Sequence, residues 1–308
     1  MNTGKTVFAQ LMSFIPEYEL KKCIDRYQGD YRVRNFTCRE HFNVMSFAQL
    51  TGRESLRDIE SCLIAFSSKL YHSGMKTPAA RNTLAKANEN RDWRIYADFA
   101  QILIKKARSL YFKDNDFRLD IDNMVYAFDS STINLCLSLF PWAKFHHQKG
   151  AVKMHTLLDL RGSIPVFLHL TDGSVHDVNA LDSLLIEPAA FYLMDKGYVD
   201  FYRLFNLIHV KRAFFVTRAK DNMAYQVEDN FEVDKDAGLI SDQSIRLTGV
   251  KSSKLYPDNI RLVVYEDYAT NNVYHFLTNN FELSALTIAE LYRERWKVEL
   301  FFKWIKQH

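Results

Sequence analysis

The chain has 308 residues, of which 47% are hydrophobic and 25% are charged. This is an ordinary composition for a globular protein, and the length leaves room for two domains. No stretch reaches the ~18 consecutive apolar residues of a membrane-spanning helix, and the first residues lack the layout of a signal peptide. The sequence therefore excludes a membrane-spanning protein, and we expect a cytoplasmic one with no membrane partner.

The net charge of +3 is unevenly distributed. Residues 1–110 hold 18 Lys and Arg against 11 Asp and Glu, and the remaining residues hold 22 against 26. A basic front suits docking on phosphates and an acidic rear suits a site rich in carboxylates, although proteins that bind no nucleic acid show similar differences. The cysteines are widely separated, which predicts free thiols rather than a disulfide or a zinc site. They are Cys23, Cys38, Cys62 and Cys136.

The front of the chain predicts helices, because apolar residues recur there at helical spacing. Its most informative segment is 41–66, where Gly52 interrupts one amphipathic helix and Ser55 caps the next. Two short helices joined through a glycine outline a helix-turn-helix, in which Arg53 and Arg57 would meet DNA at the start of the second helix. A plain helical hairpin would produce the same pattern.

We expect three parts along the chain. Residues 1–75 form a helical, helix-turn-helix-like domain, residues 76–117 a helical linker, and residues 118–308 an α/β domain. The linker is inferred from the polar run 69–94 and from a longer helix predicted at about 93–111.

Two apolar runs in the last part each end in an aspartate. Met124–Phe128 predicts a strand buried on both faces and delivers Asp129, and Ala190–Met194 does the same for Asp195. A buried strand is a rigid platform for a reactive side chain that follows it. A role as the cap of the next turn is an alternative for Asp129 alone, but two such arrangements in one chain favour a site.

The elements around these aspartates determine the fold class. The runs 152–160 and 164–170 flank a glycine-containing turn and predict a hairpin, so three antiparallel strands open the sheet. A helix, a strand, a helix, a strand at 213–217 and a closing helix follow, which is the ribonuclease-H-like order of elements. Strand-like runs occupy much of 218–280. We therefore predict an α/β fold, a ribonuclease-H-like mixed sheet with a β-rich insertion, preceded by an all-α N-terminal domain.

The last stretch of the chain predicts a helix that begins at a capping box of Thr287 and Glu290. On a regular helix four polar side chains share a stripe about 60° wide. They are Tyr292, Arg295, Glu299 and Lys306. Most other positions are apolar, so the helix is expected to be buried. A buried Glu299 implies an ion pair or a metal, and pairing with Arg295 four residues away is the simpler of the two.

This spacing resembles the signature around the third acidic residue of DDE transposases of the insertion-sequence-4 family, because all four residue types and all three intervals match. Asp129 is followed by a small polar residue, and Asp195 by a glycine and an aromatic residue, as in the first two acidic motifs of that family. A β-rich insertion before the third acidic residue, which the resemblance implies, explains why Asp195 and Glu299 are 104 residues apart while Asp129 and Asp195 are 66 apart.

The resemblance implies a reaction and a cofactor. Asp129, Asp195 and Glu299 would be the catalytic residues and would converge on a metal, because three carboxylates repel one another without a cation. Ligation by oxygen alone favours Mg²⁺ or Mn²⁺. Two ions would activate the attacking hydroxyl and stabilise the leaving 3′ oxygen, first in phosphodiester hydrolysis and then in strand transfer.

The same resemblance suggests DNA contacts, in which arginine and lysine side chains would bind phosphates. The predicted DNA-binding residues are Tyr292, Arg295, Lys306, Lys149, Lys153, Arg53 and Arg57. His176 and Asp177 precede a short predicted helix and are either strand contacts or plain turn residues. Tyr225 or Tyr256 could stack on an extruded base, and the sequence does not choose between them.

The predicted function is that of a DNA transposase that moves an insertion sequence by cut-and-paste transposition. Its partners would be double-stranded DNA, at the terminal inverted repeats and at the target, and a second copy of the chain. It would act in the bacterial cytoplasm, on the nucleoid when bound to DNA. The chain ends at His308 within a predicted helix, so we expect a truncated copy. The alternatives are a non-catalytic remnant that binds element ends and a host nuclease of the same fold.

Overall fold

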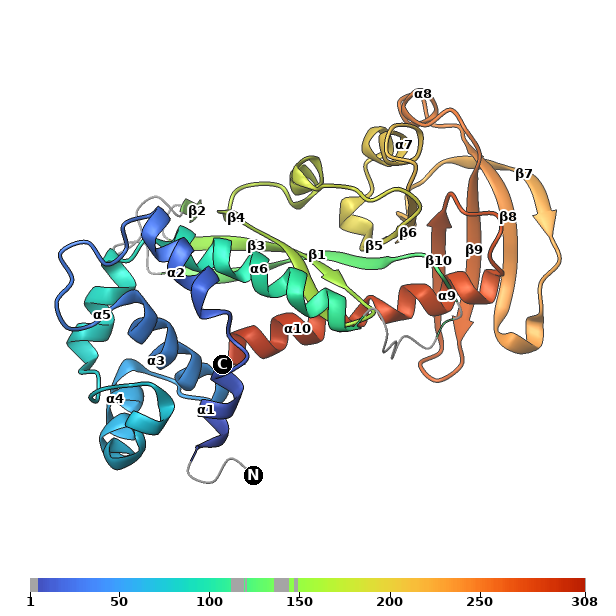
Figure 1. The fold of residues 1–308 in the computed structure, drawn as a ribbon. Coiled ribbons are helices and arrows are strands. Elements are labelled where there is room, and N and C mark those ends of the chain that lie inside the picture. The colour runs from blue at the N-terminus through green and yellow to red at the C-terminus, as the bar shows by residue number, and fades with distance from the viewer. Residues whose placement is uncertain (1–4, 112–118, 120, 136–143, 147–148, 308) are drawn as a thin grey trace. The chain divides into compact units, whose positions relative to one another are not determined.

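The computed structural model describes residues 5–111, 119, 121–135, 144–146 and 149–307 (Figure 1). The chain forms two compact units. The first comprises residues 1–106 together with 304–308, and the second comprises residues 107–303. Among the described residues, every helix is too short or too polar to cross a membrane.

The first unit is helical. Its elements are α1 (Val7–Met12), α2 (Glu17–Arg26), α3 (Cys38–Leu50), α4 (Leu56–Ala65), η1 (Ser67–Lys69), η2 (Tyr71–Ser73), α5 (Arg81–Asn90) and α6 (Trp93–Tyr111), the last of which continues into the second unit. Thr37 and Glu40 form a capping box, so α3 begins three residues before its predicted start. Ser55 caps α4 as the sequence predicts, accepting a hydrogen bond from the Asp58 N–H.

Residues 76–106 are part of the first unit rather than a linker. Leu84 of α5 packs in a core cluster with Val44, and Ile95 and Phe99 of α6 pack in a second core cluster of the same unit. All four side chains are buried. The polar composition of this segment is misleading, because a helix that buries only one stripe remains polar over the rest of its surface.

The cysteines that the structure describes bear out the predicted thiols. Cys23, Cys38 and Cys62 are free, and the first two are buried. Cys136 lies outside the described residues.

The second unit is built on a sheet of ten strands among the residues described. The strands are β1 (Val125–Leu135), β2 (Lys144–His146), β3 (Lys149–Asp159), β4 (Ile164–Asp172), β5 (Phe191–Met194), β6 (Phe214–Arg218), β7 (Tyr225–Phe231), β8 (Leu239–Leu247), β9 (Ile260–Asp267) and β10 (Asn272–Thr278). The helices are η3 (Asp177–Ser183), η4 (Lys196–Tyr198), α7 (Phe201–His209), η5 (Lys235–Ala237), α8 (Ser252–Leu255), α9 (Ala285–Glu294) and α10 (Trp296–Gln307).

The strand order confirms the predicted ribonuclease-H-like arrangement. β4 and β3 pair antiparallel, β3 and β1 pair antiparallel, and β1, β5 and β6 are mutually parallel. The β-rich insertion does not form a separate sheet. Its strands continue the same sheet beyond β6 in the order β10, β9, β8 and β7.

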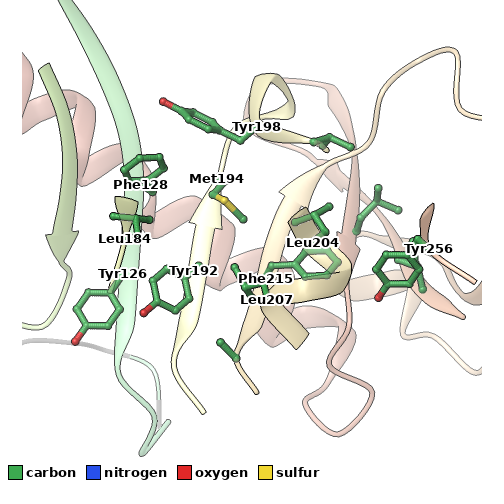
Figure 2. Close-up of a cluster of buried hydrophobic side chains, with 14 of the residues drawn as sticks. Tyr126, Phe128, Leu184, Tyr192, Met194, Tyr198, Leu204, Leu207, Phe215 and Tyr256 are labelled. Carbon is green, nitrogen blue, oxygen red and sulfur yellow. The ribbon is translucent and has the colours of Figure 1, made fainter. Parts of the chain in front are cut away.

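Helices cover both faces of this sheet (Figure 1). On one face Phe128, Met194 and Phe215 pack with Leu204 of α7 in the large core shown in Figure 2. On the opposite face α9 contacts β6, β8, β9 and β10. Successive side chains of a strand point to opposite faces. The residues that follow Phe128 and Met194 in the chain are therefore directed to the α9 face.

Two local predictions are corrected near Asp129 and Asp177. Asp129 lies within β1 rather than at its end, because β1 keeps its antiparallel partner, Thr156 of β3, after parallel pairing with β5 has ended. The 3₁₀ turn η3 replaces the short helix predicted after His176 and Asp177.

The closing helix also differs from the prediction. Its N-cap is Ser284, whose Oγ accepts a hydrogen bond from the Thr287 N–H at 3.1 Å, so Thr287 lies inside α9. The helix is interrupted at Arg295. There the Arg295 N–H bonds to the Tyr292 carbonyl and the Val298 N–H to the Arg295 carbonyl, both at 3.1 Å. These bonds span three residues instead of four and tighten the turn between α9 and α10.

Candidate active site

Asp129 and Asp195 lie side by side where the parallel pairing of β1 and β5 stops. The last paired residues are Phe128 and Met194, so each aspartate is the next residue on its chain segment. The side chain of Asp129 is 20% exposed and that of Asp195 is 33% exposed. The buried strands fix the two backbones, and both carboxylates remain reachable from solvent.

One guanidinium bridges two of the three predicted catalytic carboxylates. Nη1 of Arg295 donates to Oδ2 of Asp129 at 2.9 Å, and Nη2 donates to Oε1 of Glu299 in the first turn of α10. The Arg295 side chain is only 11% exposed. The simple helical pair between Arg295 and Glu299 is therefore present, and the same arginine extends it to Asp129, 166 residues away in the chain.

Asp195, the remaining predicted catalytic residue, is paired with a different arginine. Arg218, the last residue of β6, donates from Nε and Nη2 to Oδ1 of Asp195 at 2.9 and 2.5 Å. The Tyr292 hydroxyl donates to the same oxygen at 3.3 Å. The sequence reasoning missed Arg218 because the strand was predicted to end at Thr217. Its place at the carboxyl end of the strand beside β5 is the signal that could have found it.

The electrostatics of Asp129 reflect its burial and its acidic neighbours. Burial raises the pKa of Asp129, and the negative charges of Asp195 and Glu299 raise it further. The hydrogen bond from the Ser130 N–H and the charge of Arg295 act in the opposite direction without cancelling the rise. Asp129 is thus close enough to Asp195 and to Glu299 to be repelled by both.

The pKa of Asp195 is shifted in the opposite direction. Burial alone would raise the pKa of Asp195, but hydrogen bonds from Arg218 and from the Lys196 N–H outweigh it and hold that pKa below its usual value. Burial raises the pKa of Tyr292 to about 12, so its hydroxyl stays protonated and donates. The Arg218 guanidinium thus favours the charged form of Asp195.

The three predicted carboxylate ligands offer suitable donor atoms for a divalent metal ion, but they are not arranged to bind one in this structure. Among the described residues, no group of three or more His, Cys, Asp or Glu side chains is placed to hold a metal ion. The guanidinium of Arg295 is hydrogen-bonded to both Asp129 and Glu299 and occupies the carboxylate oxygens that it contacts. All three predicted ligands offer carboxylate oxygens, the donors that Mg²⁺ and Mn²⁺ prefer. Binding of a cation by all three requires that Arg295 release two of them.

A cavity of about 350 Å³ opens beside Glu299. Arg218, Tyr292, Arg295 and Glu299 contribute to its lining. Aromatic rings provide much of the remainder. They belong to Tyr265, Tyr274, Phe276 and Trp296. Rings next to guanidinium groups suit a nucleotide, because bases stack on aromatic side chains and phosphates accept from arginine.

Asp177 ties a loop to the residue that follows Asp129. Its Oδ1 accepts a hydrogen bond from Ser130 Oγ at 2.9 Å and lies 3.2 Å from Nζ of Lys153. Lys153 also donates to the carbonyl of Val175 at 2.8 Å and is mostly buried. The predicted DNA contact Lys153 is therefore engaged in holding this loop, and Asp177 positions Ser130 as well as forming part of the turn.

None of the other predicted DNA-binding residues has a described contact with the three carboxylates. Lys306 is exposed in the last turn of α10, within the short segment that belongs to the first unit. Arg57 is exposed in the first turn of α4, whereas Nη2 of Arg53 donates to the Thr51 carbonyl at 2.6 Å and so holds the turn between α3 and α4. The side chain of Lys149 lies outside the described residues.

The two aromatic candidates for base stacking are now distinguished. Tyr256 is only 1% exposed and packs edge-on against Phe201 and Phe205 in the core, so it cannot stack on a base. Tyr225 is 40% exposed at the start of β7.

Comparison with known proteins yields two family matches. The family described as transposase DDE domain matches residues 121–308, and a domain of unknown function, DUF4372, matches residues 3–76. The match to the transposase DDE domain covers all three carboxylates of the candidate site.

Three curated relatives carry transposase names. One from Sinorhizobium fredii, named transposase y4zB, is 34% identical over 73% of this chain and 62% of that protein. One from Geobacillus stearothermophilus, named for insertion sequence element IS5377, is 29% identical over 58% of this chain and 47% of that protein. One from Synechocystis, named for insertion sequence element IS4SA, is 25% identical over 74% and 62%. The chain thus spans about half to three fifths of the length of these relatives.

Proposed function

This chain belongs to the transposase DDE domain family, and on that premise we propose that it catalyses DNA cleavage and strand transfer in the cut-and-paste transposition of an insertion sequence. The observation that carries the proposal is the meeting of Asp129, Asp195 and Glu299 around two arginines beside an aromatic cavity. The names of the curated relatives, all transposases, support the same reaction.

Transposase DDE domains generally use divalent metal ions. We propose that Asp129, Asp195 and Glu299 hold two Mg²⁺ or Mn²⁺ ions once Arg295 has released its two carboxylates. When bound, such ions would supply Lewis-acid activation of the attacking hydroxyl and stabilise the leaving oxygen. The chain itself contributes a position within β1 for Asp129, the end of β5 for Asp195 and the first turn of α10 for Glu299.

Arg295 has a second role in this proposal. Arg295 carries two Nη groups in a planar fork, a geometry that matches a phosphate as well as it matches two carboxylates. We propose that a DNA phosphate accepts hydrogen bonds from the Arg295 guanidinium when the carboxylates are released. Tyr292 would stay beside Asp195 and keep donating to it, because its hydroxyl is protonated throughout the neutral pH range.

The first unit is assigned the recognition of the element's ends. We propose that α3 and α4 present Arg57 to the terminal inverted repeats, with Arg53 fixing the turn between the two helices. Lys306 would add a phosphate contact. A second copy of the chain is expected in the complex with DNA, because both ends of an element are cut together. The reaction would take place on DNA in the cytoplasm.

The proposal is tested by incubating the full chain with Mg²⁺ or Mn²⁺ and DNA that carries the inverted repeats flanking its gene. We expect nicks at the repeat ends that leave 3′-OH groups. D129N, D195N and E299Q should each lower the rate by about 10²-fold or more, whereas E232Q, at an exposed glutamate outside the site, should not. A chain that retards this DNA in a gel without nicking it would instead be the non-catalytic remnant.

A further inference from the structure

Within the described residues, both carboxylate oxygens of Asp129 accept a hydrogen bond. Nη1 of Arg295 donates to Oδ2 at 2.9 Å, and the N–H of Ser130 donates to Oδ1 at 2.8 Å. In the proposed function Arg295 releases the carboxylate when a cation binds. The contact from Ser130 then remains, so the orientation of the Asp129 carboxylate depends on how firmly Ser130 is held.

The sheet holds Ser130 from one side. Parallel pairing of β1 with β5 ends at Phe128 and Met194, whereas antiparallel pairing of β1 with β3 continues past Ser130. A strand segment with one neighbour lacks the ladder hydrogen bonds that a second neighbour would make. A contact from outside the sheet can therefore determine how firmly the Ser130 backbone is held.

Asp177 provides such a contact from the other face of the sheet. The Ser130 side chain points away from that of Asp129, because successive residues of a strand face opposite sides. Its Oγ donates to Oδ1 of Asp177 at 2.9 Å, and Nζ of Lys153 lies 3.2 Å from the same oxygen. Hydrogen bonds to a charged carboxylate are stronger than those between neutral groups, so Asp177 restrains Ser130.

The loop that carries Asp177 is anchored on both sides of this residue. Before it, the Val175 carbonyl accepts a hydrogen bond at 2.8 Å from Nζ of Lys153, a residue of β3 whose side chain is only 15% exposed. After it, Leu184 directly follows η3 and is buried in the same core cluster as Phe128 (Figure 2). The position of Asp177 relative to β1 and β3 is therefore fixed.

We propose that Asp177 and Lys153 are positioning residues for Asp129. Lys153 fixes Asp177, Asp177 fixes Ser130, and the N–H of Ser130 holds the Asp129 carboxylate in the orientation in which it binds a divalent cation. The inference rests on the proposed function, because it takes Asp129 as a metal ligand. It also gives Lys153 a role other than the DNA contact that the sequence predicts.

Binding of Mn²⁺ tests the consequence for the cation. The full chain is saturated with DNA that carries the inverted repeats flanking its gene, and bound Mn²⁺ is followed by electron paramagnetic resonance. D177A and S130A should each weaken Mn²⁺ binding about tenfold, because loss of a group that orients a metal ligand has an effect of that order. S130T keeps a hydroxyl and should keep the affinity. D182N is the matched control, because Asp182 lies in the same turn and pairs with Arg203.

The double variant S130A/D177A separates a positioning role from a structural one. Two residues that act through one contact have non-additive effects, so the double variant should bind Mn²⁺ about tenfold more weakly than wild type, as each single variant does. Independent effects would multiply to about 100-fold. Residues that only stabilise the fold would lower the urea midpoint and leave the Mn²⁺ affinity of the folded chain unchanged.

Hydrogen exchange of the metal-free chain tests the link to Ser130 directly. D177A should speed exchange of the β1 amides beyond Phe128 about tenfold, since a hydrogen bond to a charged group is worth about that factor. The amides of β5 should be unchanged. K153M should act in the same direction with a smaller effect, because Asp177 still accepts from Ser130, and it should leave the affinity for DNA in EDTA unchanged.

Three results would overturn the inference. They are unchanged exchange beyond Phe128 in D177A, an unchanged Mn²⁺ affinity in both D177A and S130A, and losses that multiply in the double variant. Weaker DNA binding by K153M with unchanged exchange would make Lys153 a DNA contact instead. A wild-type chain that binds no Mn²⁺ would contradict the proposed function, whereas hydrogen exchange in the metal-free chain would still decide whether Asp177 holds Ser130.

Discussion

Two arginine–carboxylate clusters of the second unit, one around Arg261 and one around Arg295, differ in how completely their hydrogen bonds are made. Arg261 and Asp242 are both about 95% buried, and Nε and Nη2 of Arg261 bind the two Asp242 oxygens at 2.8 and 2.7 Å. The remaining Nη1 donates to the carbonyls of Asn280 and Leu283. This closed pair joins β8 and β9 to the loop before α9.

The cluster around Arg295 is open by comparison. Its guanidinium gives one nitrogen to Asp129 and another to Glu299, and its Nε is buried without a hydrogen-bond partner among the described residues. Both carboxylates are partly exposed. A closed bidentate pair fixes structure, whereas a shared and incompletely satisfied arginine can exchange its acids for a phosphate. The completeness of the hydrogen bonding, rather than the residue types, separates the structural cluster from the one that we propose to be functional.

The largest effect should come from breaking the closed pair. D242A leaves Arg261 charged and unpaired in the interior, which should destabilise the second unit by about 3–5 kcal/mol. E299Q removes a charge from the open cluster, where solvent screens the pair, and should change stability by less than about 1 kcal/mol. Urea unfolding of the two variants measures both. Comparable losses would remove the distinction between closed and open clusters.

A smaller effect is expected from removing the shared arginine. R295A frees Asp129 and Glu299, so Mn²⁺ should bind the DNA-free chain about tenfold more tightly than it binds wild type, a coupling in the usual range. Electron paramagnetic resonance of free Mn²⁺ measures this directly. R293A removes a neighbouring exposed arginine and should leave the affinity unchanged. A weaker affinity in R295A would mean that Arg295 supports the metal site instead of competing with it.

The smallest expected effect is on the pH dependence of stability, through a buried and hydrogen-bonded histidine of the first unit. His41 is buried, and its ring nitrogens lie 2.8 Å from the Tyr96 hydroxyl and 2.6 Å from Oδ1 of Asn88. Burial lowers the pKa of His41 below 6.5, although the hydrogen bond with Asn88 opposes the shift. As pH falls below about 6.5, His41 binds a proton more readily in the unfolded chain than in the folded chain. The free energy of unfolding therefore decreases.

H41Q should flatten this acid-side decrease in the first unit's stability. The effect is bounded by about 1.4 kcal/mol per pH unit for one group. Urea midpoints at neutral and mildly acidic pH measure it, with H72Q at an exposed histidine as the control. An identical pH slope in wild type and H41Q would exclude His41 as its source.

The strand-borne part of the site could be predicted from the sequence. Apolar runs before Asp129 and Asp195 mark buried strands, and the ribonuclease-H-like order of elements makes these strands neighbours, which the pairing of β1 and β5 confirms. The membership in the transposase DDE domain family, inferred from the spacing at Tyr292 to Lys306, is confirmed as well.

The aspartate partners of Arg218 and Arg295 could not be predicted. Arg218 and Arg295 reach aspartates across gaps of 23 and 166 residues, and no local pattern encodes such pairs. The break at Arg295 has no proline or glycine to announce it. The start of α9 was misplaced because Ser284 and Thr287 both offer a capping hydroxyl, and the earlier one forms the cap.

The central claim is that Asp129, Asp195 and Glu299 together form a divalent-cation site. Binding of Mn²⁺ to the full chain in the presence of DNA, followed by electron paramagnetic resonance, tests it most directly. We predict that D129N and D195N each lose the bound ion, while D122N, at an exposed aspartate before β1, retains it. Equal binding in wild type, D129N and D195N would contradict the account.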